Sequence, residues 1–199
     1  MSQHTSRTRS IVLCGLSIAL LAVGAAIQLP LGPIPFTLQT LMLIIILLIL
    51  TPAEALVAVG GYLVLGAIGL PVFAGFKGGF GVLFGPTGGF LVGFFIAAAL
   101  VGLIRMVLTR KTHSFYTAAA LDVLSVVVAV IVYYAAGACW FALSTGATIQ
   151  AAFAVCILPF LVPDLLKAAA AFVCAQPIRV ALGRTTWRKL PTDAKEQLH

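Results

Sequence analysis

Long apolar stretches with very few charges among them constrain this chain more than any other feature. Of its 199 residues, 62% are hydrophobic and only 9% are Asp, Glu, Lys or Arg. A soluble domain carries about 25% charged residues, so this chain cannot cover a water-facing surface. Stretches of about 20 apolar residues match the hydrocarbon thickness of a bilayer when they are helical. The sequence therefore predicts an all-α integral membrane protein.

Prolines and glycines divide the chain into six predicted transmembrane helices within a single membrane domain, residues 1–199. The helices are expected at residues 10–28, 36–50, 53–73, 90–108, 115–143 and 163–181, with polar tails at 1–9 and 183–199. The second helix lies between Pro35 and Pro52 and is only about 22 Å long. Pro159 and Pro163 interrupt the last apolar stretch. Because proline suits a first helical turn, the sixth helix is expected to begin at Pro163.

Basic residues gather on one side of this predicted arrangement. Ten of the twelve Lys and Arg residues fall in segments that are cytoplasmic if the N-terminus lies inside. The positive-inside rule therefore predicts that both N- and C-termini are cytoplasmic. The formal net charge of +7 is then explained by basic anchors at helix ends, without a nucleic-acid partner. The proline loop at 30–35, the glycine-rich loop at 75–89 and the start of the sixth helix meet near the extracellular face.

Asp164 and Lys167 are the two charges that most need an explanation. They are three residues apart, so on a helix they share a face and can reach one another. One interpretation is an ion pair that only anchors the helix. Desolvating both charges is costly, however, and ionisable residues inside a membrane are candidates for function. We therefore predict a site for a ligand that offers hydrogen-bond donors as well as an acceptor.

The other acidic residues and the cysteines have simpler explanations. Asp122 is expected to pair with Arg105 or Arg110, and Glu54 to stabilise the start of the third helix through the helix dipole. The four cysteines lie in apolar segments without Cys-x-x-Cys spacing and are expected to be buried free thiols. No metal site or catalytic constellation is expected, so the chain is predicted not to be an enzyme.

The glycine-rich loop lacks the Gly-Lys-Ser/Thr sequence that closes a phosphate-binding loop. It is either a flexible extracellular linker or a lid over a ligand. Phenylalanines interleaved with its glycines favour a lid that covers an apolar ligand and excludes water. In the first helix, small residues at four-residue spacing allow close helix contact, either internally or with a partner subunit.

Four segments, taken in order, resemble the BioY family, the biotin-specific substrate-binding subunits of energy-coupling-factor transporters. They are residues 33–40 (PIPFTLQT), 61–73 (GYLVLGAIGLPVF), 85–89 (GPTGG) and 159–167 (PFLVPDLLK). The resemblance implies a six-helix bundle in a bacterial or archaeal plasma membrane that captures biotin from outside. It also implies that this chain has no ATPase activity. Its partners would be one membrane coupling subunit and two cytoplasmic ATPase subunits, with biotin as transported ligand and no cofactor.

The resemblance also implies particular site residues. The ligand-binding candidates are Asp164 and Lys167 of the last helix, Gly78 and Gly79 of the loop that closes over the ligand, and Thr37 and Gln39 of the helix-two motif. The docking candidates for the coupling subunit are Ala19, Ala22 and Ala26. Biotin suits the charged pair, because Asp164 can accept from the ureido N–H groups and Lys167 can donate to the ureido oxygen.

This chain departs from the family pattern near the glycine-rich loop. Lys77 stands where some relatives have a ligand-contacting asparagine, and Phe90 and Leu91 stand where some have Tyr-Arg. Our hypothesis is that Lys77 binds the biotin carboxylate in this chain. Two alternatives stay open: a self-sufficient biotin carrier that needs no ATPase, or a subunit of the same transporter class for another vitamin such as thiamine or riboflavin.

Overall fold

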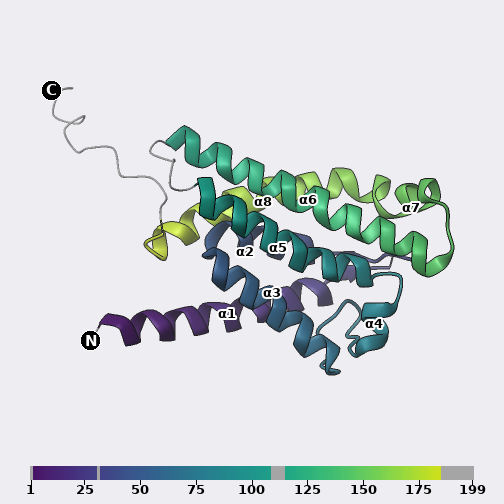
Figure 1. Ribbon diagram of the computed structural model, residues 1–199, viewed down its shortest axis with the longest axis horizontal. Helices are drawn as coiled ribbons and strands as arrows, with labels where there is room; N and C mark the ends of the chain where they lie inside the picture. The colour runs from purple at the N-terminus through teal and green to yellow at the C-terminus, as the bar shows by residue number, and fades with distance from the viewer. Residues whose placement is uncertain (1, 31, 109–114, 185–199) are drawn as a thin grey trace.

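The computed structural model describes residues 2–30, 32–108 and 115–184. Within these ranges the chain forms α1 (Ser2–Ala26), β1 (Gln28–Leu29), β2 (Phe36–Thr37), α2 (Gln39–Ile49), α3 (Pro52–Ala67), α4 (Phe80–Phe84), α5 (Gly88–Leu108), α6 (Phe115–Thr145), α7 (Ile149–Cys156) and α8 (Leu158–Ala181). The long helices form an elongated bundle (Figure 1). The start of α1 and the end of α8 lie at one end of it, and α4 and α7 lie toward the other. The predicted, predominantly helical fold is confirmed.

Four helices of the described chain are long and apolar enough to cross a membrane: α1 from Arg7, α5, α6 from Tyr116, and α8. Helices α2 and α3 are also apolar but have only 11 and 16 residues. Each of the six predicted helices thus has a counterpart. The first helix begins earlier than predicted, since α1 already starts at Ser2 and includes most of the polar segment 1–9. Residues 185–199 of the predicted C-terminal tail lie outside the described residues.

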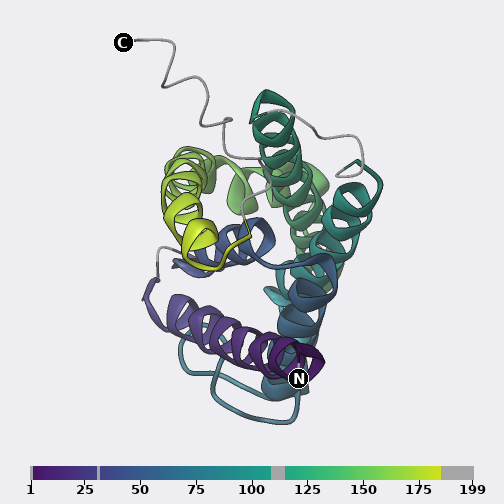
Figure 2. The same cartoon turned by 90° about the vertical axis from the view of Figure 1, so that its left-hand side faces the viewer.

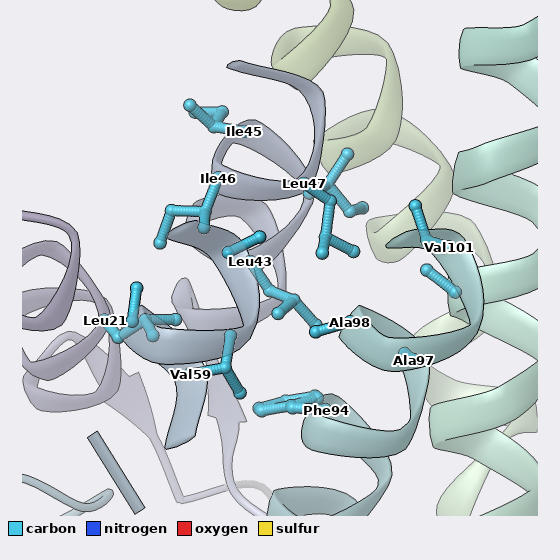
Figure 3. Close-up of a cluster of buried hydrophobic side chains, with 14 of the residues drawn as sticks. Leu21, Leu43, Ile45, Ile46, Leu47, Val59, Phe94, Ala97, Ala98 and Val101 are labelled. Carbon is cyan, nitrogen blue, oxygen red and sulfur yellow. The ribbon is translucent and has the colours of Figure 1, made fainter. Parts of the chain in front are cut away.

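Helix α2 lies in the middle of the bundle, between α1, α8 and the α5–α6 pair (Figure 2). Its residues 43–49 are all buried. Leu21 of α1, Val59 of α3 and Phe94 of α5 lie around Leu43 of α2 in the hydrophobic core (Figure 3). A helix of 11 residues is about 16 Å long, so it cannot cross the hydrocarbon core alone. A helix this short must be covered by protein or lie where the bilayer is thin. The burial of residues 43–49 shows that protein covers α2.

Glycines let α5 and α6 pack closely together. A Cβ on Gly89 would lie 2.2 Å from Trp140 Cβ and 2.6 Å from the Ala136 carbonyl oxygen. A Cβ on Gly93 would lie 2.9 Å from Tyr133 Cα. The Trp140 indole N–H also donates to the carbonyl of Gly85 at 3.0 Å, just before α5. These contacts fix Tyr133 of α6 relative to α5.

The second and third helices are shorter than predicted. Leu29 and Phe36 pair across the antiparallel strands β1 and β2, so α2 begins only at Gln39. Helix α3 ends at Ala67, because the chain turns at Gly69, which has φ +107°. Glycine adopts this left-handed conformation without the steric cost that a Cβ would bring. Apolar composition continues past both helix ends, and composition alone does not distinguish a helix from an apolar strand or loop.

The start of the last helix also differs from the prediction. Helix α8 begins at Leu158, with Pro159 in its first turn and Pro163 inside the helix. The break between α7 and α8 is at Ile157, whose φ and ψ are −120° and −54°. Either proline suits a first turn, and Pro159 takes that position. Asp164 therefore lies in the second turn of α8, and the expectation that it sits at the helix start is wrong.

A buried charged cluster closes the C-terminal end of α2. Asp122 of α6 forms ion pairs with Arg105 of α5 at 3.2 Å and with Arg179 of α8. Arg179 Nε donates to the Leu48 carbonyl at 2.8 Å, and Arg105 Nη1 donates to the Leu47 carbonyl at 3.2 Å. The arginines thus satisfy carbonyls in the last turn of α2, which lack helical partners. The predicted Asp122–Arg105 pair is confirmed, and Arg179 is an additional partner.

Glu54 stabilises the start of α3, as predicted. Thr51 N donates to Glu54 Oε2 at 2.9 Å within a capping box, and the Ser10 hydroxyl donates to Glu54 Oε1 at 2.7 Å. Arg184, which follows α8, forms an ion pair of 2.6 Å with the same carboxylate. These contacts join α1, α3 and the end of α8 at the end of the bundle that holds the N-terminus (Figure 1).

Candidate functional site

Asp164 and Lys167 form a buried ion pair one turn apart on α8. Lys167 Nζ lies 2.7 Å from Asp164 Oδ1, which confirms the contact predicted from their spacing. The ammonium also donates to the Thr37 carbonyl at 2.7 Å and to the Thr40 hydroxyl at 3.1 Å. It lies 3.9 Å from the centroid of the Phe36 ring, within cation–π distance. The pair is therefore held by the β2–α2 segment as well as by its own helix.

Three hydroxyl groups complete the surroundings of the Asp164 carboxylate. Tyr133 and Tyr134 of α6 donate to Oδ2 at 3.0 and 2.8 Å, respectively. The Thr40 hydroxyl donates to Oδ1 at 3.2 Å. With only 4% of Asp164 exposed, these donors replace the water that would otherwise solvate its charge. Helices α2, α6 and α8 thus meet at one carboxylate.

A cavity of about 260 Å³ opens beside this charged pair. Its wall brings the polar groups together with aromatic rings, which are Phe73, Phe90, Phe94, Phe160, Tyr133 and Tyr134. Residues of the proline loop, including Pro33 and Pro35, complete the wall. Small-molecule sites in proteins have this construction, a mainly apolar pocket with a few polar groups that orient the ligand.

Tyr62 of α3 connects two further parts of the cavity wall. Its hydroxyl accepts from Gln39 Nε2 at 2.9 Å and donates to the Val72 carbonyl at 3.0 Å. Its ring meets the Phe73 ring edge to face, with centroids 5.4 Å apart. Gly66 makes room for that ring, since a Cβ there would lie 2.0 Å from Phe73. The segment after α3 is therefore fixed against the start of α2.

The structure brings most of the predicted ligand-binding residues to this cavity. Those that line it are Thr37, Gln39, Lys77, Asp164 and Lys167. Gly78 and Gly79 are not among the lining residues and shape the neighbouring turn instead. A Cβ on Gly78 would lie 2.3 Å from the Leu70 carbonyl oxygen, and Gly79 has φ +92°. Both positions therefore require glycine for the path of the chain.

The glycine-rich loop does not cover the cavity with its phenylalanines. Phe76, Phe80 and Phe84 are 70%, 62% and 70% exposed. The loop contributes Lys77, Val82 and Thr87 to the wall instead. These three rings therefore do not line the cavity in this structure, and closure of the loop over a ligand stays a prediction. Alternating glycine and phenylalanine indicated flexibility and apolar area, but it did not indicate which way the rings point.

Sequence reasoning missed the hydroxyl groups that surround Asp164. Thr40 lies in the segment 33–40, where Thr37 and Gln39 were the predicted ligand-binding residues. Tyr133 and Tyr134 lie within an apolar helix. Two adjacent tyrosines deep in an apolar helix are themselves a signal, since a buried tyrosine hydroxyl generally has a hydrogen-bond partner. The sequence contains no pattern that would assign that partner to another helix.

The remaining expectations concern the first helix and the cysteines. Ala19 is exposed on the surface of α1, whereas Ala22 is partly buried against the core. Cys139 and Cys174 are exposed, so the expectation of four buried thiols is wrong for these two. Their helices are apolar on outward faces too, as lipid-facing surfaces are. Among the described residues, no group of three His, Cys, Asp or Glu residues could hold a metal ion.

The fold and the cavity together define a class of protein. A multi-pass helical membrane protein that encloses a charged, aromatic-lined cavity toward one end of its bundle is built to bind a small solute. Comparison with known proteins assigns the family. The family model described as "BioY family" matches residues 1–184. The chain belongs to the BioY family, as its four sequence segments predicted.

Individual relatives agree with this assignment. The chain is 36% identical over 173 residues to a "Probable biotin transporter BioY" of Pyrococcus horikoshii, covering 87% of this chain and 98% of the relative. It is 42% identical over 125 residues to the "Biotin transporter BioY" of Thermotoga maritima, covering 63% and 73%. A crystal structure of the S-component for biotin from an ECF-type ABC transporter shares the fold, with a TM-score of 0.77, 23% identity and coverage of 90% and 94%.

Proposed function

We propose that this chain is a biotin-binding membrane subunit that captures biotin from outside for ATP-driven uptake. A separate module, consisting of a membrane coupling subunit and two ATPase subunits, supplies the energy. The observation that carries the proposal is the buried Asp164–Lys167 pair at the wall of an aromatic-lined cavity. The names of the relatives, which describe biotin transporters, support biotin over thiamine or riboflavin. They also support the expectation that the chain is not an enzyme.

The cavity matches the chemistry of biotin group by group. Asp164 Oδ2 accepts N–H groups of the ureido ring, and Lys167 Nζ donates to the ureido oxygen in exchange for one of its three present hydrogen bonds. Both bonds are charge-assisted, and such bonds are about twice as strong as neutral ones. The aromatic rings of the wall cover the apolar bicycle and chain. Lys77, exposed at the wall, binds the carboxylate at the other end of the molecule.

The proposed topology has six membrane crossings, both termini in the cytoplasm and the cavity near the extracellular face. An even number of crossings agrees with Figure 1, in which the start of α1 and the end of α8 lie at the same end of the bundle. The β1–β2 loop and the glycine-rich loop, which both contribute to the cavity wall, then face outward. The arginine-rich cluster at the end of α2 faces the cytoplasm, in agreement with the positive-inside rule.

Calorimetry on the detergent-purified protein tests the ligand assignment. Asp164→Asn and Lys167→Ala each leave the other buried charge without its partner, which costs about 3–5 kcal/mol in measured cases. We expect each to weaken biotin binding at least about tenfold, which is about 1.4 kcal/mol. Lys189→Ala, in the C-terminal tail, is the control and should bind like the unmodified chain. Unchanged affinity in both site variants, or tighter binding of thiamine or riboflavin than of biotin, would refute the assignment.

Uptake into liposomes separates the proposed subunit from a self-sufficient carrier. The chain is reconstituted alone or with the coupling subunit and both ATPases, and labelled biotin is measured inside. We expect accumulation only in the complete complex with ATP. The exposed position of Ala19 on α1 agrees with a contact to the coupling subunit there. Equal uptake by the chain alone would establish the self-sufficient carrier instead.

A further inference from the structure

The hydrogen bonds of Asp164 raise a question about how the empty site accepts its ligand. An ionised carboxylate offers about four lone-pair positions. In this structure four donors occupy them: Lys167 and Thr40 at Oδ1, and Tyr133 and Tyr134 at Oδ2. A ligand N–H group can therefore reach this carboxylate only when one of the protein's own donors leaves it.

We propose that the Tyr134 hydroxyl is the donor that leaves, so that it holds the place of a ligand N–H group in the empty site. The inference rests on the proposed function, because it requires a ligand with N–H donors. The Tyr134 hydroxyl donates to Oδ2 at 2.8 Å, and Tyr134 itself lines the cavity. When the ligand arrives, its N–H group takes Oδ2, and the tyrosine hydroxyl leaves the carboxylate.

Two of the other donors cannot leave without breaking further contacts. Lys167 would lose its ion pair, and its ammonium is also bound to the Thr37 carbonyl. The Thr40 hydroxyl both donates to Asp164 Oδ1 and accepts from Lys167 Nζ, so its departure would cost two bonds. Both groups bind Oδ1, which leaves Oδ2 as the oxygen where exchange costs least.

The two tyrosines at Oδ2 differ in how firmly their rings are held. Tyr133 has no exposed surface, meets the Phe94 ring edge to face with centroids 5.6 Å apart, and lies where Gly93 brings α5 against it. Tyr134 keeps 6% of its surface exposed, and its described ring contact is with Tyr133, at 4.8 Å. Tyr134 is therefore the group that can move while the carboxylate stays in place.

This exchange predicts that removing a hydroxyl from the binding site increases the affinity for biotin. Tyr134→Phe removes a bond that exists only in the empty protein, so it destabilises the empty state and not the complex. Biotin should then bind about threefold to tenfold more tightly, as expected for one net hydrogen bond. Tyr133→Phe is the matched comparison, because it removes the same hydroxyl from the same oxygen. Its bond persists in both states and its ring also lines the cavity, so this variant should show no gain in affinity.

The experiment combines calorimetry with thermal melting of the detergent-purified variants. We expect Tyr134→Phe to melt at a lower temperature than the unmodified chain without biotin, and at the same temperature with saturating biotin. Tyr133→Phe should melt lower under both conditions. A purely structural role of Tyr134 would lower both melting temperatures and leave the affinity unchanged or reduced.

The outcomes separate this inference from the proposed function. If the unmodified chain binds biotin and Tyr134→Phe binds it equally or more weakly, the inference is overturned and the proposed function stands. The inference is also overturned, with the proposed function intact, if Tyr133→Phe tightens binding as much as Tyr134→Phe, or if Thr40→Val alone tightens it. If the unmodified chain binds no biotin, the proposed function fails and the inference fails with it.

Discussion

At the scale of single residues, Lys77 is a cation at the cavity wall that the described structure leaves available to a ligand. Lys77 and Phe73 are joined by backbone hydrogen bonds of 3.0 and 3.3 Å, which fix the turn between them. Among the ion pairs formed by described residues, none involves the Lys77 ammonium. An exposed ammonium at a cavity rim attracts an anionic group without the cost of burying its own charge.

We expect Lys77→Gln to weaken the binding of biotin by about threefold to tenfold, the range for one partly solvated charge-assisted bond. The binding of biotin amide, which has no carboxylate, should not change. Lys77→Arg keeps the charge and should retain most of the affinity for biotin. Calorimetry with both ligands on the three variants measures this. An equal loss for biotin and its amide would show that Lys77 does not recognise the carboxylate.

How far the site could be predicted depended on whether its contacts are local in sequence. Asp164 and Lys167 could be paired from the sequence because a separation of three residues on a helix brings two side chains together. The bonds from Tyr133, Tyr134 and Thr40 to Asp164 cross between helices that are 30 to 124 residues apart. Such contacts follow from the packing of the bundle, which apolar composition does not determine.

At the scale of elements, the close contact of α5 and α6 depends on glycine. We expect Gly89→Ala to destabilise the protein by about 1–3 kcal/mol, because its Cβ would lie 2.6 Å from a backbone oxygen of α6. Gly15→Ala is the matched control: no atom lies within 4 Å of its Cβ position on α1, and alanine favours a helix. Melting of both variants in detergent tests the difference.

An equal loss of stability in the two variants would show that helix packing at Gly89 is not tight. A smaller loss in Gly15→Ala, or a slight gain, is the expected pattern. Because Tyr133 lies on the same contact one turn away, Gly89→Ala should also weaken biotin binding, which calorimetry on the same samples measures.

Some helix boundaries could be predicted from the sequence and others could not. The starts and ends of α5 and α6 could be predicted to within about two residues, since glycine or polar loops flank them. The start of α8 could not, because Pro159 and Pro163 are both acceptable in a first turn. The choice is made at Ile157, where the chain breaks between two packed helices. Nothing in the identity of an isoleucine indicates that break.

At the scale of the whole molecule, orientation in the membrane is the testable property. Phe76 is 70% exposed on the glycine-rich loop, so Phe76→Cys should react with a membrane-impermeant maleimide on intact cells. Lys195→Cys, in the C-terminal tail, should react only after the cells are permeabilised. The unmodified chain, with its four native cysteines, gives the background. The reverse pattern of labelling would contradict the outward position of the cavity.

The buried cluster at the end of α2 also has a consequence for how the bundle assembles. Arg105 and Arg179 come from two different helices, and with the single charge of Asp122 they leave one positive charge in excess. A helix offers partial negative charge only at its C-terminal end. If α2 were threaded through the bundle in the opposite direction, unpaired N–H groups would face these arginines. The cluster therefore helps to specify the direction of a helix whose residues 41–49 are a uniform apolar run.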